Sequence, residues 1–395
     1  MRNSFQVQVG ADVLLHDQLE LIAGKRIGLI TNHSALLKSG EHLVDALVKN
    51  DAIELIALFG PEHGIRGKAP DRKSIAHETD PDTGIPVFSL FGKITKPTRQ
   101  MLKGIDLLMF DIQDVGARFY TYATTLALTM EAAAAKGIPY ILLDRPNPIG
   151  GEHIEGPVLE KGLRAFVGWL PLPIVHGLTL GELALMINGE GWLRGALEVD
   201  LTVVKMKGWK RSLTFDQTKL KWINPSPSIR SLHTALIYPG TCFIEGTNVS
   251  EGRGTEHPFE QIGAPWIKSR ELCSELRSIR LPGVRFSPIA FTPRSTRTVT
   301  TDSKFEGSRC QGVSLEVTDP VRFQPVKTGV ALLWALQKLY PEDLKLKNRR
   351  LDELIGTRFV RQSIKQGMSP SEIADHWRSE IDEFALKRKP YLLYR

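Results

Sequence analysis

The chain has 395 residues, of which 42% are hydrophobic and 24% are charged, proportions that exclude a disordered, collagen-like or coiled-coil protein. At about 150 residues per domain, this length predicts roughly two to three domains with cores that need no disulfide or metal to fold. Lys and Arg total 51 against 44 Asp and Glu, which leaves a formal net charge of +7. No basic block is dense enough to indicate a nucleic-acid partner.

Cysteine spacing and hydrophobic runs exclude further classes. The three cysteines, Cys242, Cys273 and Cys310, lie far apart without CxxC spacing, which argues against a disulfide framework and a zinc site. The N-terminal residues do not resemble a signal peptide, and no segment reaches the roughly 18 apolar residues that span a bilayer. We therefore expect no membrane span. The compartment is left open, as is the choice between monomer and homodimer.

The first half of the chain alternates short apolar runs with helical patterns. The expected strands are Arg26–Thr31, Ile53–Phe59, Pro86–Leu90, Ile105–Phe110, Pro139–Leu143 and Leu201–Met206. The expected helices are Gly40–Asn50, Thr95–Lys103, Thr121–Lys136 and Thr179–Asn188. Because the apolar runs are nearly continuous, these strands are expected to be covered on both faces. The alternation predicts an α/β fold with a doubly wound, mostly parallel sheet.

The second half has a different pattern. A polar, proline-bearing segment at 207–231 predicts a crossover between domains. Beyond it, strands are expected at Thr234–Tyr238, Val284–Phe291 and Gly312–Val317, and helices at Pro325–Leu339, Arg350–Gln366 and Ser369–Ala385. The sequence therefore predicts an α/β domain over residues 1–230 and a smaller α+β domain over residues 231–395.

Polar side chains follow four of the expected strands at their carboxyl ends. They are Asn32 and His33 after the first, Glu62, His63 and Arg66 after the second, Asp111, Gln113, Asp114, Arg118 and Tyr120 after the fourth, and Asp144, Arg145 and Asn147 after the fifth. Because the carboxyl ends of parallel strands share one edge, where ligands bind, these loops predict a site. Turn formation and helix capping explain the Gly and Pro residues of the loops, but explain Glu62, Gln113 and Arg145 poorly.

A Gly-rich loop at residues 245–256 predicts the second wall of a cleft between the domains. It carries Glu245, Asn248, Glu251 and Arg253, so its charges alternate in sign. Its glycines allow a close approach of backbone to a ligand. A mobile, solvated surface loop explains the same composition about equally well, and the spacing alone does not decide between the two.

Several common chemistries lack their motifs in this sequence. There is no GxGxxG after the first strand, no GxxxxGK[ST], no GxSxG and no HExxH. The remaining rim of carboxylates, aromatics and arginines suits glycosidases, which use two carboxyl groups, one of them protonating the leaving oxygen. The candidates for sugar stacking are Phe119, Tyr120 and Tyr122, and those for binding a substrate carboxylate are Arg66, Arg118, Arg145 and Arg253. Core packing and structural salt bridges are the competing explanations for these residues.

Seven motifs occur in order along the chain: GPEHGIRG (60–67), DIQDVGARFYTY (111–122), DRPNPIGG (144–151), EGP (155–157), NPSPS (224–228), YPGTCFIEGTNVSEGRGT (238–255) and YLLYR (391–395). Together they resemble the NamZ-type exo-β-N-acetylmuramidases, a family once catalogued as being of unknown function. The resemblance implies a Rossmann-like domain and a smaller C-terminal domain with the site in the cleft between them. It also implies release of β-1,4-linked N-acetylmuramic acid from the non-reducing end of peptidoglycan fragments, without a cofactor.

The resemblance also implies roles for individual residues. Glu62, within PEHG, is expected to be the catalytic carboxyl, and Glu245 and Asp114 are the candidates for the second carboxylate. The expected substrate contacts are Asn32, His63, Arg66, Asp111, Gln113, Arg118, Tyr120, Asp144, Arg145, Asn147, Asn224, Asn248, Glu251 and Arg253. No metal ligand is expected, and the expected partner is a peptidoglycan-derived saccharide. Members are commonly exported, and Ser228 stands where similar sequences often have Asn.

The expected mechanism has Glu62, with a raised pKa, protonate the glycosidic oxygen. The second carboxylate stabilises or attacks the anomeric carbon or activates water, at separations of about 5–5.5 Å for retention and 6.5–9.5 Å for inversion. The 2-acetamido group of the substrate is an alternative to that carboxylate. The lactyl carboxylate of muramic acid gives Arg118 and Arg145 a role in recognition.

Two other functions fit the same residues. One is a non-catalytic binding protein for cell-wall sugars or muropeptides that uses the same cleft without turnover. The other is a metal-assisted hydrolase with Glu62, His63, Asp111 and Asp114 as ligands, although adjacent Glu and His on a loop lack the usual ligand spacing.

Overall fold

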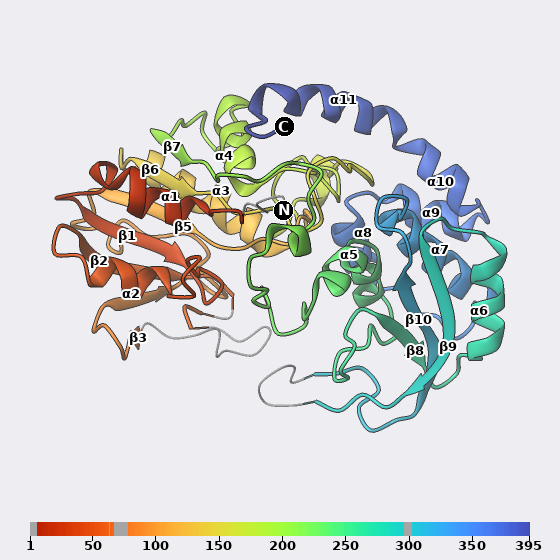
Figure 1. The fold of residues 1–395 in the computed structure, drawn as a ribbon. Helices are drawn as coiled ribbons and strands as arrows, with labels where there is room; N and C mark the ends of the chain where they lie inside the picture. Colours follow the sequence, from red (N-terminus) through yellow and green to blue (C-terminus); the bar gives the residue numbers. More distant parts are fainter. Residues whose placement is uncertain (1–5, 63, 67–77, 296–301) are drawn as a thin grey trace, which may run out of the picture.

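A seven-stranded sheet forms the first lobe of the computed structural model, which describes residues 6–62, 64–66, 78–295 and 302–395 (Figure 1). Its strands are β1 (Arg26–Thr31), β2 (Glu54–Gly60), β3 (Glu78–Thr79), β4 (Pro86–Ser89), β5 (Leu107–Asp111), β6 (Tyr140–Leu143) and β7 (Leu201–Val204). They lie in the order β3-β4-β2-β1-β5-β6-β7, and every neighbouring pair is parallel except β3 and β4. The predicted α/β fold with a mostly parallel sheet is confirmed.

Helices cover both faces of this sheet. They are α1 (Gly10–Asp17) and α2 (Leu43–Val48) on one face, and α3 (Thr121–Ala134) and α4 (Leu180–Gly189) on the other. Within β1, Ile27 and Leu29 pack in the core below α1 and α2, whereas Ile30 packs in the core that contains α3 and α4. Because side chains alternate between the faces of a strand, burial on both sides requires the continuous apolar runs of the sequence.

The order of the strands places several loops on one edge of the sheet. The chain runs from β1 outward to β2 and β4, and then crosses back to the other side of β1 to form β5, β6 and β7. The strand order therefore reverses between β1 and β5, and ligands of such sheets bind outside the carboxyl ends of the strands near this reversal. The loops after β2 and β5 both contribute to the pocket described below.

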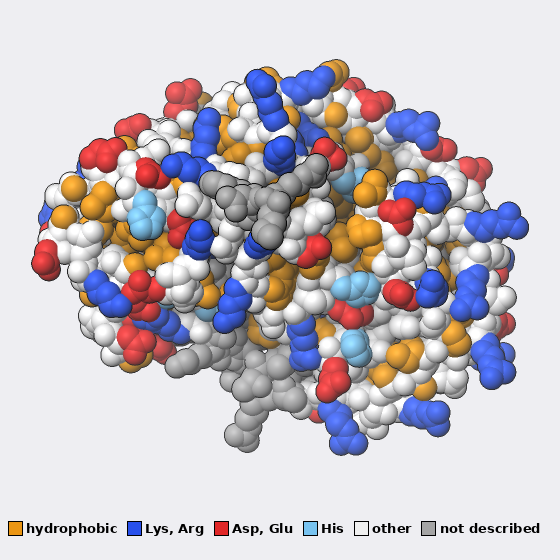
Figure 2. Space-filling model, in the orientation of Figure 1, with side chains coloured by type: hydrophobic (Ala, Val, Ile, Leu, Met, Phe, Trp, Pro, Cys, Tyr) orange, Lys and Arg blue, Asp and Glu red, His pale blue; other side chains and the backbone are white. Residues whose placement is uncertain are grey.

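The second lobe contains a small antiparallel sheet with helices packed on it. The strands lie in the order β8 (Gln261–Ala264), β10 (Cys310–Val317) and β9 (Val284–Phe291). The helices are α5 (Leu232–Thr241), α6 (Ser269–Ser278), α7 (Pro325–Leu339), α8 (Asn348–Ile355), α9 (Phe359–Lys365), α10 (Pro370–His376) and α11 (Arg378–Arg388). The sequence therefore predicted the α+β character of this lobe correctly. Basic and acidic side chains are interspersed over the face of the molecule seen in Figure 2.

One predicted strand, Thr234–Tyr238, is wrong, because these residues lie within α5. The Ser231 side chain caps this helix by accepting a hydrogen bond from the Thr234 backbone N–H at 3.1 Å. Near the end of α5, Gly240 lies against α7 so closely that an added Cβ would come within 1.9 Å of the Pro325 carbonyl oxygen. The apolar run therefore reflects a helix that is buried on several sides, and not a strand.

Three predicted helices also differ in the structure. The segment Thr95–Lys103 contains turns at residues 99–103 and no helix, and Pro97 disfavours the helical conformation of Lys96 before it. The segment predicted as Arg350–Gln366 divides into α8 and α9 at Gly356, whose φ is +90°. The segment predicted as Ser369–Ala385 divides at Trp377 into α10 and α11. A periodic apolar pattern continues across such breaks and so does not reveal them.

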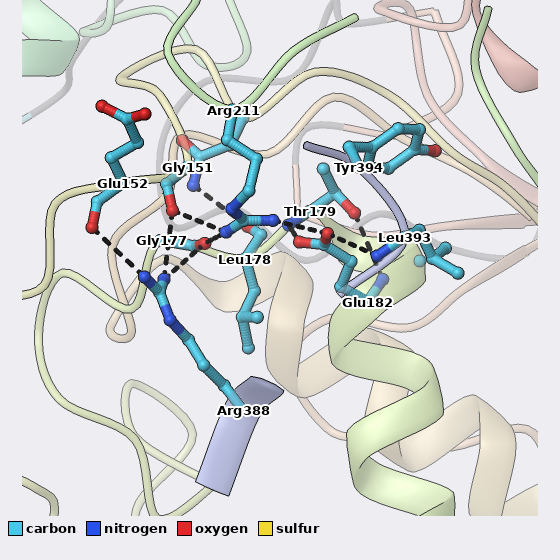
Figure 3. Close-up of polar contacts among 12 residues, drawn as sticks. Gly151, Glu152, Gly177, Leu178, Thr179, Glu182, Arg211, Arg388, Leu393 and Tyr394 are labelled. Carbon is cyan, nitrogen blue, oxygen red and sulfur yellow. Dashed lines mark hydrogen bonds and ion pairs between the residues drawn. The ribbon is translucent and has the colours of Figure 1, made fainter. Parts of the chain in front are cut away.

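The C-terminal segment returns from the second lobe to the first along α11 (Figure 1). At the end of α11, the Arg388 guanidinium donates hydrogen bonds to backbone carbonyls of the first lobe, among them that of Gly177 at 2.8 Å (Figure 3). Further on, the Tyr394 hydroxyl donates a hydrogen bond of 2.6 Å to Asp144, which follows β6. The tail therefore fastens the second lobe to the sheet of the first.

Candidate active site

An open pocket of about 620 Å³, measured out to its mouth in the solvent, lies where the two lobes meet. From the first lobe it is lined by Glu62, Phe119, Tyr120, Thr121, Tyr122 and Val167, and from the connecting segment by Ser226 and Ile229. From the second lobe it is lined by Tyr238, Cys242, Glu245, Arg253, Phe259, Arg350 and Leu354.

Glu62 reaches this pocket from the loop that follows β2. Its side chain is half-buried, and its Oε2 lies 3.5 Å from the hydroxyl of Thr121, the first residue of α3. The carboxyl therefore lies near the N-terminus of a 14-residue helix, where the helix dipole favours negative charge. The place of Glu62 in the pocket makes it the candidate proton donor. The helix dipole works against the raised pKa expected for this carboxyl, and that rise stays a prediction.

Aromatic rings form one wall of the pocket. The ring of Tyr120 lies edge-to-face on Tyr122 and Tyr238, with centroids 4.8 and 6.0 Å apart, and Tyr238 lies in the same way on Phe259 at 4.8 Å. The Tyr122 hydroxyl donates to the Pro225 carbonyl at 2.7 Å. Burial raises the pKa of the Tyr120, Tyr122 and Tyr238 phenols, so this wall is uncharged near neutral pH.

A second carboxylate, Glu245, lines the same pocket between two arginines. It lies in the 3-10 helix Cys242–Gly246, and it is buried. Arg253 Nη2 donates to Glu245 Oε1 at 3.0 Å, and Arg350 Nη2 donates to Oε2 at 2.8 Å. Two guanidinium groups favour the ionised carboxylate. Glu245 is therefore suited to act as a base, a nucleophile or a stabiliser of positive charge, and not as the proton donor.

The loop at 245–256 is fixed by contacts of its charged side chains. Arg253 also donates to the Ser228 hydroxyl at 2.9 Å, forms an ion pair with Glu251 at 3.5 Å, and lies 5.0 Å from the centre of the Phe259 ring. Glu251 in turn pairs with Lys304 at 2.8 Å. Glu245 and Arg253 of this loop line the pocket, whereas Asn248 is not among its lining residues. The role of the loop as the second wall of an active-site cleft stays a prediction.

Two arginines that were predicted to bind a substrate carboxylate contact other parts of the protein. Arg118 is 1% exposed and donates to the backbone carbonyls of Pro157, Leu172 and Leu354 at 2.8–3.1 Å, and burial lowers its pKa to about 9. Arg145 forms a buried ion pair with Asp111. Neither arginine is among the residues that line the pocket in the described part of the chain. Their expected role in binding a substrate carboxylate stays a prediction.

The other predicted contacts fall into three groups. Tyr120 lines the pocket, and Asn32 reaches its wall by donating to the Tyr122 hydroxyl at 2.9 Å. Asn224 is exposed in the segment that connects the lobes, and accepts a hydrogen bond from the Trp222 indole. The residues held by contacts within the fold are Arg66 (to Asp80 and Asp45), Gln113 (to the Pro146 carbonyl), Asp144 (from Tyr394 and Thr179), Asn147 (to the Leu178 carbonyl) and Asn248 (to the Asp343 carbonyl). His63 lies outside the described residues.

Asp114, the alternative second carboxylate, lies buried after β5 and is not among the pocket-lining residues described. Its Oδ2 accepts a hydrogen bond from the Gly116 backbone N–H at 2.8 Å, and burial raises its pKa to about 7. Of the two candidates, Glu245 is the one that the structure brings into the pocket with Glu62.

Sequence reasoning missed several residues of the pocket. Thr121 and Ser226 lie within recognised motifs but were not singled out, and Tyr238 was assigned to a strand. Arg350 lies on an amphipathic helix, where a charged residue ordinarily faces the solvent. Only its spatial position identifies it as part of a site.

The described residues show no group of three or more His, Cys, Asp or Glu side chains that could hold a metal ion. They also include no helix that is long and apolar enough to cross a membrane.

Known proteins resemble this chain over nearly its whole length. It is 49% identical to the peptidoglycan β-N-acetylmuramidase NamZ of Bacillus subtilis strain 168 over 390 residues, which are 98% of this chain and 92% of that protein. Crystal structures of two DUF1343 family proteins from Bacteroides fragilis superpose on it with TM-scores of 0.91 and 0.82, at 36% and 34% identity, each covering 99% of both chains.

Two family models divide the chain between them. The model of the N-terminal part of the exo-β-N-acetylmuramidase NamZ matches residues 27–233, and that of its C-terminal part matches residues 236–394. The motif residues Glu62 and Glu245 thus fall in different halves of the family and meet in one pocket. This chain belongs to the exo-β-N-acetylmuramidase NamZ family.

Proposed function

We propose that this protein is a glycoside hydrolase that releases β-1,4-linked N-acetylmuramic acid from the non-reducing end of peptidoglycan fragments. Membership of the NamZ family and 49% identity to a peptidoglycan β-N-acetylmuramidase support the reaction. One structural observation carries the proposal. Glu62 and Glu245 line a single pocket between the lobes, which supplies the two carboxyl groups that glycosidic cleavage ordinarily uses.

The surroundings of the two carboxyl groups suggest different roles for them. The guanidinium groups of Arg253 and Arg350 favour the ionised form of Glu245, and we place this negative charge beside the anomeric carbon, where positive charge develops, either directly or through water. Glu62 lies in the same pocket, 3.5 Å from the hydroxyl of Thr121, and is proposed as the acid that protonates the leaving oxygen. The 2-acetamido group of the substrate is the alternative to direct attack by Glu245.

Substitution of Glu62 tests the proposal. Glu62→Gln should lower kcat on a chromogenic β-N-acetylmuramide by about 100-fold or more, because general acid catalysis contributes about 10²–10⁴-fold. Glu54→Gln is the matched control, since it makes the same change at the exposed start of β2, far from the pocket. Both variants should melt near the wild-type temperature. Full activity of Glu62→Gln would show that Glu62 is not the acid.

The same assay separates the alternative functions. A binding protein for wall sugars would bind the muramide without releasing free muramic acid. A metal-assisted hydrolase would lose activity with a chelator, whereas the proposed reaction should not. The anomeric configuration of the first product, followed by NMR, distinguishes retention from inversion.

A further inference from the structure

Arg350 is the more exposed of the two arginines that line the pocket. It lies on α8 in the second lobe, lines the pocket, and its side chain is 35% exposed. Within the described residues, Arg350 donates one hydrogen bond, from Nη2 to Glu245 at 2.8 Å. A guanidinium has five N–H donors, so the remaining ones are available to a ligand.

The neighbouring arginine is already committed to the protein. Arg253 contacts Glu245, Glu251, the Ser228 hydroxyl and the face of Phe259, and its side chain is only 14% exposed. Its geometry is therefore that of a structural link between the loop at 245–256 and the pocket wall. Arg350 is the guanidinium of this pocket with both exposure and uncommitted donors.

The charges of the pocket favour an anionic ligand during the reaction. Its lining contains two carboxyl groups, Glu62 and Glu245, and two guanidinium groups, Arg253 and Arg350. When Glu62 carries the proton that it donates, one positive charge is left without a lining carboxylate. A saccharide with a single carboxylate balances that charge, whereas a neutral saccharide of the same shape does not.

We propose that Arg350 binds the carboxylate of the saccharide substrate and thereby determines the preference for an acidic sugar. The inference rests on the proposed function, because it names the group that recognises the lactyl arm of the muramic acid at that site. A planar guanidinium matches a carboxylate with two parallel hydrogen bonds. In Arg350 one hydrogen of Nη2 stays on Glu245, and the second Nη2 hydrogen forms the pair together with Nη1 or Nε.

The test compares an acidic and a neutral form of one substrate. The chromogenic β-N-acetylmuramide and its lactyl methyl ester differ in the charge of the carboxyl group and by one added methyl group. Arg350→Met should lower kcat/KM on the acid about 10- to 100-fold more than on the ester, as expected for a lost hydrogen bond to a charged group. Arg350→Lys, which keeps the charge but not the fork, should recover part of the difference.

Arg349→Met is the matched control, because Arg349 is the preceding residue of α8, is 92% exposed and, within the part of the chain that the structure describes, pairs with Glu353 of the same helix. It should keep the wild-type ratio between the two substrates. Arg350 also contacts Glu245, and if that were its whole role, Arg350→Met would lower activity on acid and ester equally. An equal loss would overturn the inference.

A binding measurement separates this inference from the proposed function. Calorimetry with free N-acetylmuramic acid and free N-acetylglucosamine needs no turnover. Wild type should bind the acidic sugar more tightly, and Arg350→Met should remove that difference while Arg349→Met keeps it. If wild type hydrolyses neither glycoside but shows this pattern, the proposed reaction fails and the role of Arg350 stands. If wild type hydrolyses the muramide and Arg350→Met leaves the preference unchanged, Arg350 does not bind the carboxylate.

Discussion

The protonation state of Asp114 gives a prediction that addresses both stability and catalysis. Its carboxyl is buried, Oδ2 accepts one hydrogen bond from Gly116, and Oδ1 has no hydrogen-bond partner among the described residues. Burial raises its pKa to about 7, although the nearby backbone N–H groups of Gly116 and Val115 oppose the rise. Asp114→Asn replaces this carboxyl with a neutral group of the same shape.

The raised pKa of Asp114 determines how the stability of the protein changes with pH. Between about pH 4 and pH 7 the folded protein holds a proton on Asp114 that the unfolded chain has already lost, so the stability from this group falls as pH rises. The change is about 1.4 kcal/mol for each pH unit in that window. Asp114→Asn lacks it. From pH 5 to pH 8 the variant should therefore gain about 3 kcal/mol in free energy of unfolding relative to wild type.

The assay is urea unfolding of wild type and variant at pH 5, 6.5 and 8 at constant ionic strength. Subtracting the free energy of unfolding of wild type from that of the variant removes the contributions of the other groups that titrate over this range. Asp51→Asn, a change at an exposed position before β2, should differ from wild type in free energy of unfolding by about the same amount at all three pH values. Parallel stability curves for wild type and Asp114→Asn would refute the argument that burial controls this carboxyl.

The same variant tests the second carboxylate of the proposed reaction. Because Asp114 is not among the lining residues, Asp114→Asn should keep its kcat within a few-fold of wild type. A large loss of kcat in a variant that folds normally would instead make Asp114 the second carboxylate, in place of Glu245.

Three further substitutions have expected outcomes. Glu245→Gln should lower kcat on the muramide by about 100-fold or more with the fold intact by circular dichroism, as expected for a carboxylate that acts on the reacting carbon. Gly240→Ala should lower the free energy of unfolding by about 1–3 kcal/mol in urea, because its Cβ would lie 1.9 Å from the Pro325 carbonyl oxygen. Tyr394→Phe removes the hydrogen bond to Asp144 and should cost about 1–3 kcal/mol, visible as a lower Tm.

The first lobe was predictable because its strands are buried on both faces. The run Arg26–Thr31 coincides with β1, and the other predicted parallel strands differ from the structure only at their ends. The pattern failed at Thr234–Tyr238, where a helix packed on several sides gives a similar apolar run. It also missed the break at Gly356, because a single left-handed residue leaves the apolar periodicity on either side unchanged.

The site was predictable where its residues follow strands or lie in glycine-rich loops. Glu62 and the loop with Glu245 and Arg253 were identified in this way, and the structure brings them together. The placement of polar residues after strands does not say which of them turn toward the ligand. Arg145, for example, was expected to bind substrate but forms an ion pair with Asp111. Arg350 was missed because its contact with Glu245 joins residues 105 positions apart.

Arg118 links the packing of the lobes to the geometry of the pocket. It follows β5 in the first lobe and donates at 2.8 Å to the Leu354 carbonyl of α8, the same helix that carries Arg350. A Cβ on Gly356, the residue that ends α8, would lie within 2.5 Å of the Arg118 guanidinium, so the fit is close. Because Glu62 belongs to the first lobe and Arg350 holds Glu245 in the second, this contact helps to set the separation of the two carboxyl groups. If Glu62 and Glu245 are the reacting pair that we propose, that separation decides between retention and inversion. The stereochemistry then depends on how the lobes pack and not only on the residues that touch the sugar.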